Sequence, residues 1–216
     1  DRLRSRGLGD VYKRQILSVT PEHILIQASS GAGLFYGIQT LLQLSQPSGT
    51  GYSIVSVEVQ DTPRFAYRGM MLDVSRHFFS KEFVKKQIDA LAFYKLNRLH
   101  LHLTDAAGWR LEIKKYPLLT KVGSKGNYHD PSAPAAFYTQ EDIKDIVAYA
   151  AARHIMIVPE FDMPGHATAA CRAYPELSGG GEGRWKDFTF HPCKEETFRF
   201  INDVLDELIT LFPSPY

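Results

Sequence analysis

The sequence has few cysteines and no long hydrophobic run, and both absences limit the kind of protein it can be. Cys171 and Cys193 are the only cysteines among 216 residues. Two such residues do not make a disulfide framework, and their positions do not show whether they pair, so two unpaired thiols is the simpler interpretation. No apolar stretch approaches the roughly 20 residues that a membrane-spanning helix needs. We therefore expect no membrane partner.

An excess of charge of one sign is also missing. The chain has 25 basic and 24 acidic side chains, which gives a formal net charge of +1. This balance argues against electrostatic capture of nucleic acid or of an anionic membrane. The hydrophobic content of 44% and the charged content of 23% are ordinary for a globular protein. The length allows one sizeable core, or a small domain together with part of a larger one.

The N-terminal residues lack the features of a natural start. They contain no initiating Met, no secretory signal and no apolar period. We interpret residues 1–15 as a disordered or non-native leader and leave them out of the fold prediction.

Residues 16–63 have the pattern of a small α+β domain. Short strands are predicted at 16–19 and 23–28, a helix at 34–44 and a further strand at 52–60. We interpret Gly31 and Gly33 as turn residues, because the full dinucleotide-binding pattern is missing. The residues expected on the buried face of the helix are Leu34, Ile38, Leu41 and Leu42.

From residue 64 onward, strands and helices alternate. Strands are predicted at 69–74, 97–103 and 155–161, and helices at 81–95, 139–153 and 194–212. Ser80 and Thr139 are the expected N-caps, and Asp142 completes a capping box with Thr139. This order predicts right-handed βαβ units and a parallel sheet covered on both faces. The expected buried face of the last helix is Phe198, Ile201, Leu205, Leu208 and Ile209.

Polar residues follow every strand of this second part, as on the catalytic face of a (β/α)8 TIM barrel. A doubly wound sheet is the alternative, but a barrel distributes such groups over several strand ends more naturally. The connections at about 104–138 and 162–193 are long, which is typical of functional loops. Only three of eight strands are predicted, so residues 64–216 are interpreted as the N-terminal part of a truncated barrel in an α/β protein.

Three side chains at these strand ends are candidates for a site, and two of them, Arg76 and Asp105, have a structural alternative. The fork of Arg76 suits adjacent hydroxyls, or it pairs with Asp73. Asp105 could orient a histidine or take a sugar hydroxyl, or it caps its loop. His166 follows the turn Pro164-Gly165 and lies near Glu160 and Asp162, as a general acid paired with a carboxylate would.

Other residues of the same region favour structural roles. His100 and His102 share a face of one strand and could bind zinc, but no further ligand set is evident, so core or supporting roles are favoured. Trp109 and Trp185 could stack on a sugar ring, although tryptophans in such loops are more often packed.

Three segments carry a family resemblance: residues 68–78, 101–110 and 159–166. Together they resemble glycoside hydrolase family 20, the β-N-acetylhexosaminidases, and the likeness extends over about residues 16 to 216. The resemblance implies that Arg76 grips the outer hydroxyls of a terminal N-acetyl sugar. It also implies that Asp105 and His166 support a catalytic glutamic acid, and that Asp162 lies in the pocket wall.

The resemblance further implies hydrolysis of terminal β-linked N-acetylglucosamine or N-acetylgalactosamine without a cofactor. In this family the acetamido oxygen of the substrate attacks the anomeric carbon, an Asp orients it and the adjacent Glu protonates the leaving oxygen. Implied substrates are N-acetylhexosamine-containing glycans or chitooligosaccharides. Family members usually act outside the cytoplasm, so a periplasmic or secreted location is expected.

The sequence departs from the family pattern at two places. The His-x-Gly-Gly-Asp-Glu motif that carries the catalytic pair is absent, so these 216 residues alone are expected to be inactive. Ala106 stands where many members have a second Asp. Two alternatives stay open: a metal-dependent barrel hydrolase that uses His100 and His102, and a non-catalytic sugar-binding remnant.

Overall fold

The computed structural model of the chain describes residues 14–215, apart from the side chain of Arg184. Residues 1–13 of the predicted leader lie outside the described part. The first strand, β1 (Gln15–Val19), begins at Gln15, whose side chain is buried. The predicted leader is therefore wrong at that residue.

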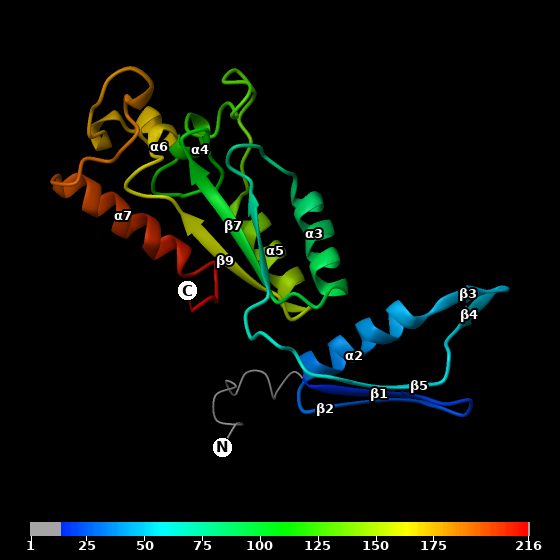
Figure 1. Ribbon diagram of the computed structural model, residues 1–216. Helices are drawn as coiled ribbons and strands as arrows, with labels where there is room; N and C mark the ends of the chain where they lie inside the picture. The colour runs from blue at the N-terminus through cyan, green and yellow to red at the C-terminus, as the bar shows by residue number, and fades with distance from the viewer. Residues whose placement is uncertain (1–13, 216) are drawn as a thin grey trace.

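The small domain is a three-stranded antiparallel sheet with one helix on it. Strand β1 lies between β2 (Ile24–Ala28) and β5 (Val57–Asp61). Helix α2 (Gly31–Leu44) lies along one face of the sheet (Figure 1), and the short hairpin of β3 (Gln46–Ser48) and β4 (Gly51–Ser53) follows it. The single strand predicted at 52–60 is in fact the two strands β4 and β5.

Helix α2 packs through small residues rather than through its leucines. Gly33, Tyr36 and Gly37 are buried, whereas Leu34, Ile38 and Leu42 are 42–55% exposed. A Cβ atom on Gly33 would lie 2.7 Å from the Cβ atom of Ala28, so the helix approaches the sheet at a distance that only glycine allows. The predicted buried face of this helix is therefore wrong, and Gly33 is a contact residue of the helix rather than a turn residue.

The second part has three parallel strands in chain order, β6 (Gly69–Asp73), β7 (Arg98–Asp105) and β9 (Met156–Phe161). Helix α3 (Lys81–Phe93) connects the first two strands, α5 (Gln140–Ala151) precedes β9, and α7 (Glu195–Leu208) follows it. The three predicted β/α units are confirmed. So are the N-cap at Ser80 and the capping box of Thr139 and Asp142, which satisfy the free N–H groups of α3 and α5.

The two long connections contain short elements of their own. Strand β8 (Gly108–Trp109) pairs antiparallel with the end of β7, and α4 (Leu118–Lys121) follows it. The second connection holds α6 (Thr168–Ala173) and the 3-10 turns η1 (Pro175–Leu177) and η2 (Gly183–Trp185). Both connections therefore cover the carboxyl ends of the strands with ordered structure.

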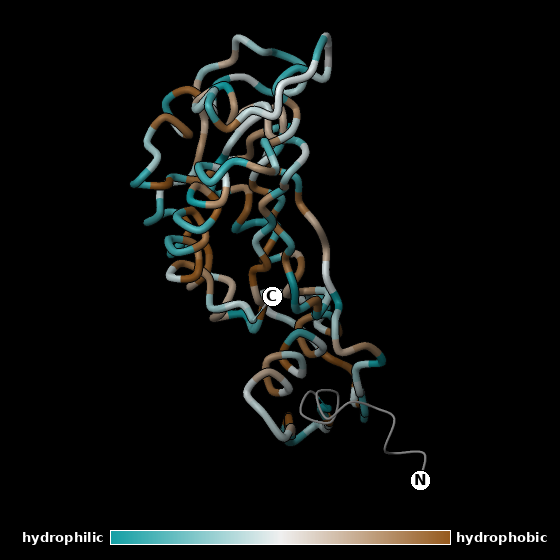
Figure 2. Tube along the Cα trace, turned by 90° about the vertical axis from the view of Figure 1, so that its left-hand side faces the viewer, coloured by the Kyte–Doolittle hydropathy of each residue, from teal (hydrophilic) through white to brown (hydrophobic). Residues whose placement is uncertain are grey.

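The core lies between the sheet and its helices. Leu99, Leu101 and Leu103 of β7 are fully buried and belong to the same cluster as the buried residues of α3, α5 and α7. Figure 2 shows hydrophobic colouring along the centre of this part and hydrophilic colouring over much of the outside. The other face of the sheet is more open within residues 14–215: Met71 is 52% exposed and His100 is partly exposed. The expectation that both faces of the sheet are covered is therefore wrong for the described residues.

Helix α7 also presents a different face from the one predicted. Phe200, Val204 and Leu208 are buried, and the ring of Phe200 packs against Trp109, Tyr116 and Phe190. Of the predicted face only Leu208 is buried, whereas Phe198, Leu205 and Ile209 are 42–71% exposed. The helix has apolar residues on two stripes, and the aromatic side chains of the preceding loops select between them.

The small domain lies at the end of the sheet opposite the carboxyl ends of the parallel strands. Lys95, just after α3, holds the two parts together, because its ammonium group lies 2.8 Å from Asp61 and 2.6 Å from the Thr40 hydroxyl. The arrowheads of β7 and β9 point away from the small domain (Figure 1). Any site at the carboxyl ends of these strands is therefore remote from the small domain.

None of the helices described between residues 14 and 215 is long and apolar enough to cross a membrane.

The two cysteines are both free thiols, as the simpler interpretation of the sequence expected, and they differ in exposure. Cys193 is exposed, whereas Cys171 is 1% exposed and burial raises its pKa to about 11. Because the thiolate is the reactive form, we expect iodoacetamide at pH 8 to label Cys193 in the folded protein and Cys171 only after denaturation. Peptide mass spectrometry of both samples checks this. Equal labelling rates in the folded protein would contradict it.

Candidate active site

The predicted site residues come together at the carboxyl ends of the three parallel strands. Arg76 follows β6, Asp105 is the last residue of β7, and Asp162 and His166 follow β9. Parallel strands in register end at the same edge of a sheet, so residues far apart in sequence meet there. We call the following six residues the strand-end cluster: Asp73, Arg76, His102, Asp105, Asp162 and His166.

Asp105 is the centre of the cluster. Its carboxylate, 4% exposed, lies 2.6 Å from Arg76 Nη2, 2.9 Å from His102 Nε2 and 3.0 Å from His166 Nδ1. It also accepts a hydrogen bond from the Ala106 amide, which is the loop-capping role considered above. Burial alone would raise the pKa of Asp105, but the hydrogen bonds from His102 and His166 and the charge of Arg76 lower it below its usual value. Asp105 is therefore a buried anion that holds three side chains.

Arg76 is fixed at both ends of its guanidinium group. Nη1 lies 2.6 Å from Asp73 Oδ2, and Nη2 binds Asp105. The other oxygen of Asp73 accepts hydrogen bonds from the amides of Ser75 and Arg76, which shapes the turn after β6. The predicted ion pair with Asp73 is therefore present, and it aims the guanidinium group instead of removing it from the site. The side chain is still 36% exposed, so it can reach a ligand.

His102 lies behind Asp105 and bridges two carboxylates. Its Nε2 atom faces Asp105, and its Nδ1 atom lies 3.0 Å from Glu160. The hydrogen bond to Asp105, together with that to Glu160, raises the pKa of His102 to about 9 in spite of its burial. The ring is therefore a buried cation near neutral pH that donates to both acids. This arrangement supports the interpretation of His102 as a supporting residue.

His166 enters the cluster from the turn after β9. Its φ of 54° lies in the left-handed region, where non-glycine residues are uncommon and are often part of functional sites. Nδ1 donates to Asp105, and Asp162 Oδ2 lies 3.9 Å from the same atom. Among the described residues, no hydrogen-bond partner faces Nε2. The ring is therefore oriented by a carboxylate on one side and has a free nitrogen on the other.

A metal-site interpretation finds less support in this geometry. His102, Asp105 and Asp162 each offer an atom within 4.8 Å of the others, but both nitrogens of His102 already face carboxylates. Glu160 also binds His100, whose Nε2 atom lies 2.6 Å from the same oxygen. A histidine with a proton on each nitrogen has no lone pair for a metal. The His-x-His pair is satisfied by Glu160 without an ion.

The two tryptophans differ in role. Trp109 is 3% exposed, donates to the Leu111 carbonyl and packs on Phe161, so it is a core residue. Trp185 is 54% exposed and contacts Phe188, whose ring lies 4.8 Å from that of His166. Sugar stacking by Trp185 stays a prediction. The position of Phe188 beside His166 could not be predicted, because no motif surrounds Phe188 in the sequence.

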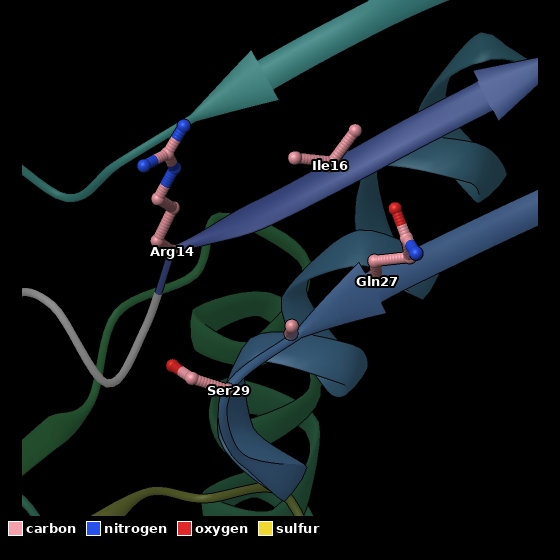
Figure 3. A pocket seen from close by; sticks show the side chains of 5 residues that line it. Arg14, Ile16, Gln27 and Ser29 are labelled. Carbon is pink, nitrogen blue, oxygen red and sulfur yellow. The ribbon is translucent and has the colours of Figure 1, made fainter.

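A separate hollow lies in the small domain, away from the strand-end cluster. Figure 3 shows side chains that line it, on β1, on β2 and just outside these strands, and its volume is about 480 Å³. The described residues that line it are Arg14, Ile16, Gln27, Ala28 and Ser29. Among the lining residues that the structure describes, none is a carboxylate or a histidine.

Comparison with known families assigns both parts of the chain to one family. The profile for the catalytic domain of glycosyl hydrolase family 20 matches residues 65–216, and the profile for domain 2 of the same family matches residues 16–62. The chain belongs to glycosyl hydrolase family 20. The fold prediction, an α/β chain with a small preceding domain and β/α units of a TIM barrel, is confirmed with it.

Individual members of the family match almost the whole chain. A β-hexosaminidase of Porphyromonas gingivalis is 46% identical over 208 residues, which are 89% of this chain and 27% of that protein. A β-hexosaminidase of Vibrio furnissii is 40% identical over 93% of this chain and 36% of the relative. The family 20 exo-β-N-acetylglucosaminidase of Vibrio harveyi, solved with N-acetylglucosamine, superposes with a TM-score of 0.87 and 40% identity over 94% of this chain and 35% of that structure. The chain thus spans about a quarter to two fifths of the relatives it matches.

Proposed function

We propose that the whole protein removes terminal, non-reducing, β-linked N-acetyl-D-hexosamine from glycans by substrate-assisted, retaining hydrolysis. By the whole protein we mean this sequence together with any further segment that its gene encodes. The observation that carries the proposal is the connected series Arg76–Asp105–His166 at the carboxyl ends of the strands. It supplies a fork for hydroxyl groups and an oriented histidine, both held by the buried carboxylate of Asp105. The names of the family relatives support the substrate class.

In this proposal the chain contributes binding and orientation. Arg76 donates to the outer hydroxyls of the terminal sugar, because a planar guanidinium group suits two adjacent oxygens. Asp105 fixes the His166 ring, whose free Nε2 atom meets the catalytic glutamic acid and keeps it poised to protonate the leaving oxygen. Asp162, beside His166, lines the wall of the sugar pocket. The acetamido oxygen of the substrate is the nucleophile.

The described residues of the strand-end cluster do not include the Asp-Glu pair that this mechanism needs. The sequence contains one Asp-Glu dipeptide, Asp206-Glu207, and it lies on α7. Glu207 accepts hydrogen bonds from the amides of Lys114 and Lys115 and from the Gln140 side chain. This carboxylate organises the outer layer and is not part of the strand-end cluster.

An assay of two proteins tests the proposal. We expect the whole protein to release nitrophenol from 4-nitrophenyl N-acetyl-β-D-glucosaminide, and the 216-residue chain alone to release none, because its strand-end cluster lacks the Asp-Glu pair. The measurement is the absorbance of nitrophenolate at equal protein concentrations, with the glucoside that lacks the acetamido group as control substrate. Turnover by the 216 residues, or equal turnover of the two substrates by the whole protein, would contradict the mechanism.

Two further points belong to the proposal. We infer that the natural substrates are N-acetylhexosamine-containing glycans or chitooligosaccharides, since one relative, from Vibrio harveyi, is named N,N'-diacetylchitobiase. A periplasmic or secreted location is supported by the family resemblance alone. Cell fractionation with a marker enzyme for each compartment tests it.

A further inference from the structure

Arg110, just after β8, is a fully buried arginine that the proposed mechanism does not use. It is 0% exposed and is among the largest side chains with no solvent contact. Among the residues described, no carboxylate hydrogen-bonds to its guanidinium group. A buried cation without an anion is costly unless every donor is satisfied. Its partners therefore show what the residue is for.

All five N–H donors of the Arg110 guanidinium group go to main-chain carbonyls. Nε and Nη2 bind the Ser75 carbonyl at 3.1 and 2.8 Å, and Nη2 also binds that of Gly126 at 2.7 Å. Nη1 binds the carbonyls of Ser124 and Ala136 at 2.6 and 3.0 Å. An arginine has five donors in a rigid plane and a lysine has three on a flexible stem. Only arginine can satisfy this set.

These carbonyls belong to two segments that meet beside Arg76. Ser75 is the residue before Arg76, so Arg110 holds the peptide unit on which Arg76 is mounted. Ser124, Gly126 and Ala136 belong to the loop between α4 and α5, and in the same loop the Tyr128 amide donates to the Arg76 carbonyl at 2.9 Å. Arg76 is therefore held by carboxylates at its side chain and by Arg110 and this loop at its backbone.

Two residues next to Arg110, Gly108 and Ser75, also contribute to these contacts. A Cβ atom on Gly108 would overlap the guanidinium carbon of Arg110, so this position requires glycine. The Ser75 hydroxyl donates to the Gly108 carbonyl at 2.6 Å, which ties the strand β8 to the turn after β6.

We propose that Arg110 is a positioning residue, which sets the place of Arg76 and thereby the discrimination of the outer hydroxyls of the terminal sugar. The inference rests on the proposed function, in which Arg76 binds those hydroxyls. Arg110 touches no substrate. It acts by fixing the peptide unit between Ser75 and Arg76 against the loop of residues 124–136.

The test compares Arg110→Lys with wild type in the whole protein. The substrates are 4-nitrophenyl N-acetyl-β-D-glucosaminide and its 4-deoxy analogue, which lacks the hydroxyl across the ring from the reacting carbon. Since a misplaced Arg76 loses a charge-assisted hydrogen bond, we expect kcat/KM for the first substrate to fall about tenfold and for the analogue less than about twofold. An equal fall for both substrates would mean a merely structural role and would overturn the proposal.

Arg172→Lys is the matched control. Arg172 also binds carbonyls of the same loop, those of Gly123 and Lys125 at 3.1 and 2.9 Å, but its hydrogen bonds within the described residues do not include Ser75. We expect this variant to keep the wild-type preference for the hydroxylated substrate. The same loss of preference in Arg172→Lys as in Arg110→Lys would contradict a specific role of Arg110.

Two further measurements keep the test decisive. If Arg110→Lys does not fold, Gly108→Ala replaces it, because the added methyl displaces the guanidinium group and should weaken the same preference. Hydrogen–deuterium exchange is independent of turnover: Arg110→Lys should speed exchange at the amides of Arg76 and Tyr128, and Arg172→Lys should not. Unchanged exchange at both amides would overturn the positioning role, whereas absence of turnover in the wild type would overturn only the proposed function.

Discussion

Arg76→Ala in the whole protein is expected to lower kcat/KM for an N-acetyl-β-hexosaminide by about a thousandfold. The guanidinium group is held between Asp73 and Asp105 with part of its surface exposed, so it can offer two hydrogen bonds to the sugar without rearrangement. Two charge-assisted hydrogen bonds at about 2 kcal/mol each correspond to roughly three powers of ten in kcat/KM. Initial rates measured across substrate concentration give the value.

Two control variants distinguish the loss of the planar guanidinium group from the loss of a positive charge and from a general loss of stability. Arg76→Lys keeps the positive charge and loses the planar fork, so we expect it to recover only a small part of the activity. Arg153→Ala removes an arginine just after α5 whose Nε atom lies 2.7 Å from Asp89, a distance close to those of the Arg76 ion pairs. That variant should keep its activity. A loss below tenfold for Arg76→Ala would argue against a sugar-binding role.

The local parts of the fold could be predicted because their causes are local. Ser80 and Thr139 lie directly before helices α3 and α5, and an acid three residues after Thr139 completes the capping box. The alternation of strands and helices needs only the apolar periods of each segment. The position of a strand end then predicts which residues lie at the carboxyl edge of the sheet, which is why the sequence indicates Arg76, Asp105 and His166 as candidates.

The packing faces of helices α2 and α7 could not be predicted, because the information lies elsewhere in the chain. Helix α2 contacts its sheet through Gly33 and Gly37. Because glycine has no apolar side chain, a hydrophobic periodicity does not identify it as a buried position. Helix α7 has two apolar stripes, and the positions of Trp109, Tyr116 and Phe190 show which of them is buried. A periodic pattern identifies a helix, but the buried face of that helix also depends on the residues that pack against it.

The network behind the site depends on strand register and on main-chain atoms. The register of β7 and β9 places His102 opposite Glu160, so the pair of histidines is recognisable in the sequence while its partner is not. Arg110 is harder still, because its partners are carbonyl groups, which every residue carries. No residue type marks them, and an arginine in a loop is ordinarily interpreted as exposed.

Asp105→Asn is expected to destabilise the whole protein by about 3–5 kcal/mol at pH 6. The substitution leaves Arg76 and the buried His102 without the anion that both of them contact, and the loss of one partner of a buried ion pair typically costs this much. The measurement is urea unfolding of wild type and variant. Asp89→Asn, which removes a carboxylate that is 51% exposed and paired with Arg153, is the control and should change stability little.

The size of this loss should depend on pH in a definite direction. His102 has its pKa raised to about 9, first by Asp105, and in the unfolded chain it titrates near 6.5. Its contribution to stability is therefore complete below about pH 6.5 and is lost as the pH rises through 9. The shift corresponds to about 3 kcal/mol, of which Glu160 supplies part. The difference in the free energy of unfolding between wild type and Asp105→Asn should thus become smaller from pH 6 to pH 9.5. A difference in unfolding free energy that stays constant, or increases, over this pH range would mean that His102 is not the cation that Asp105 stabilises.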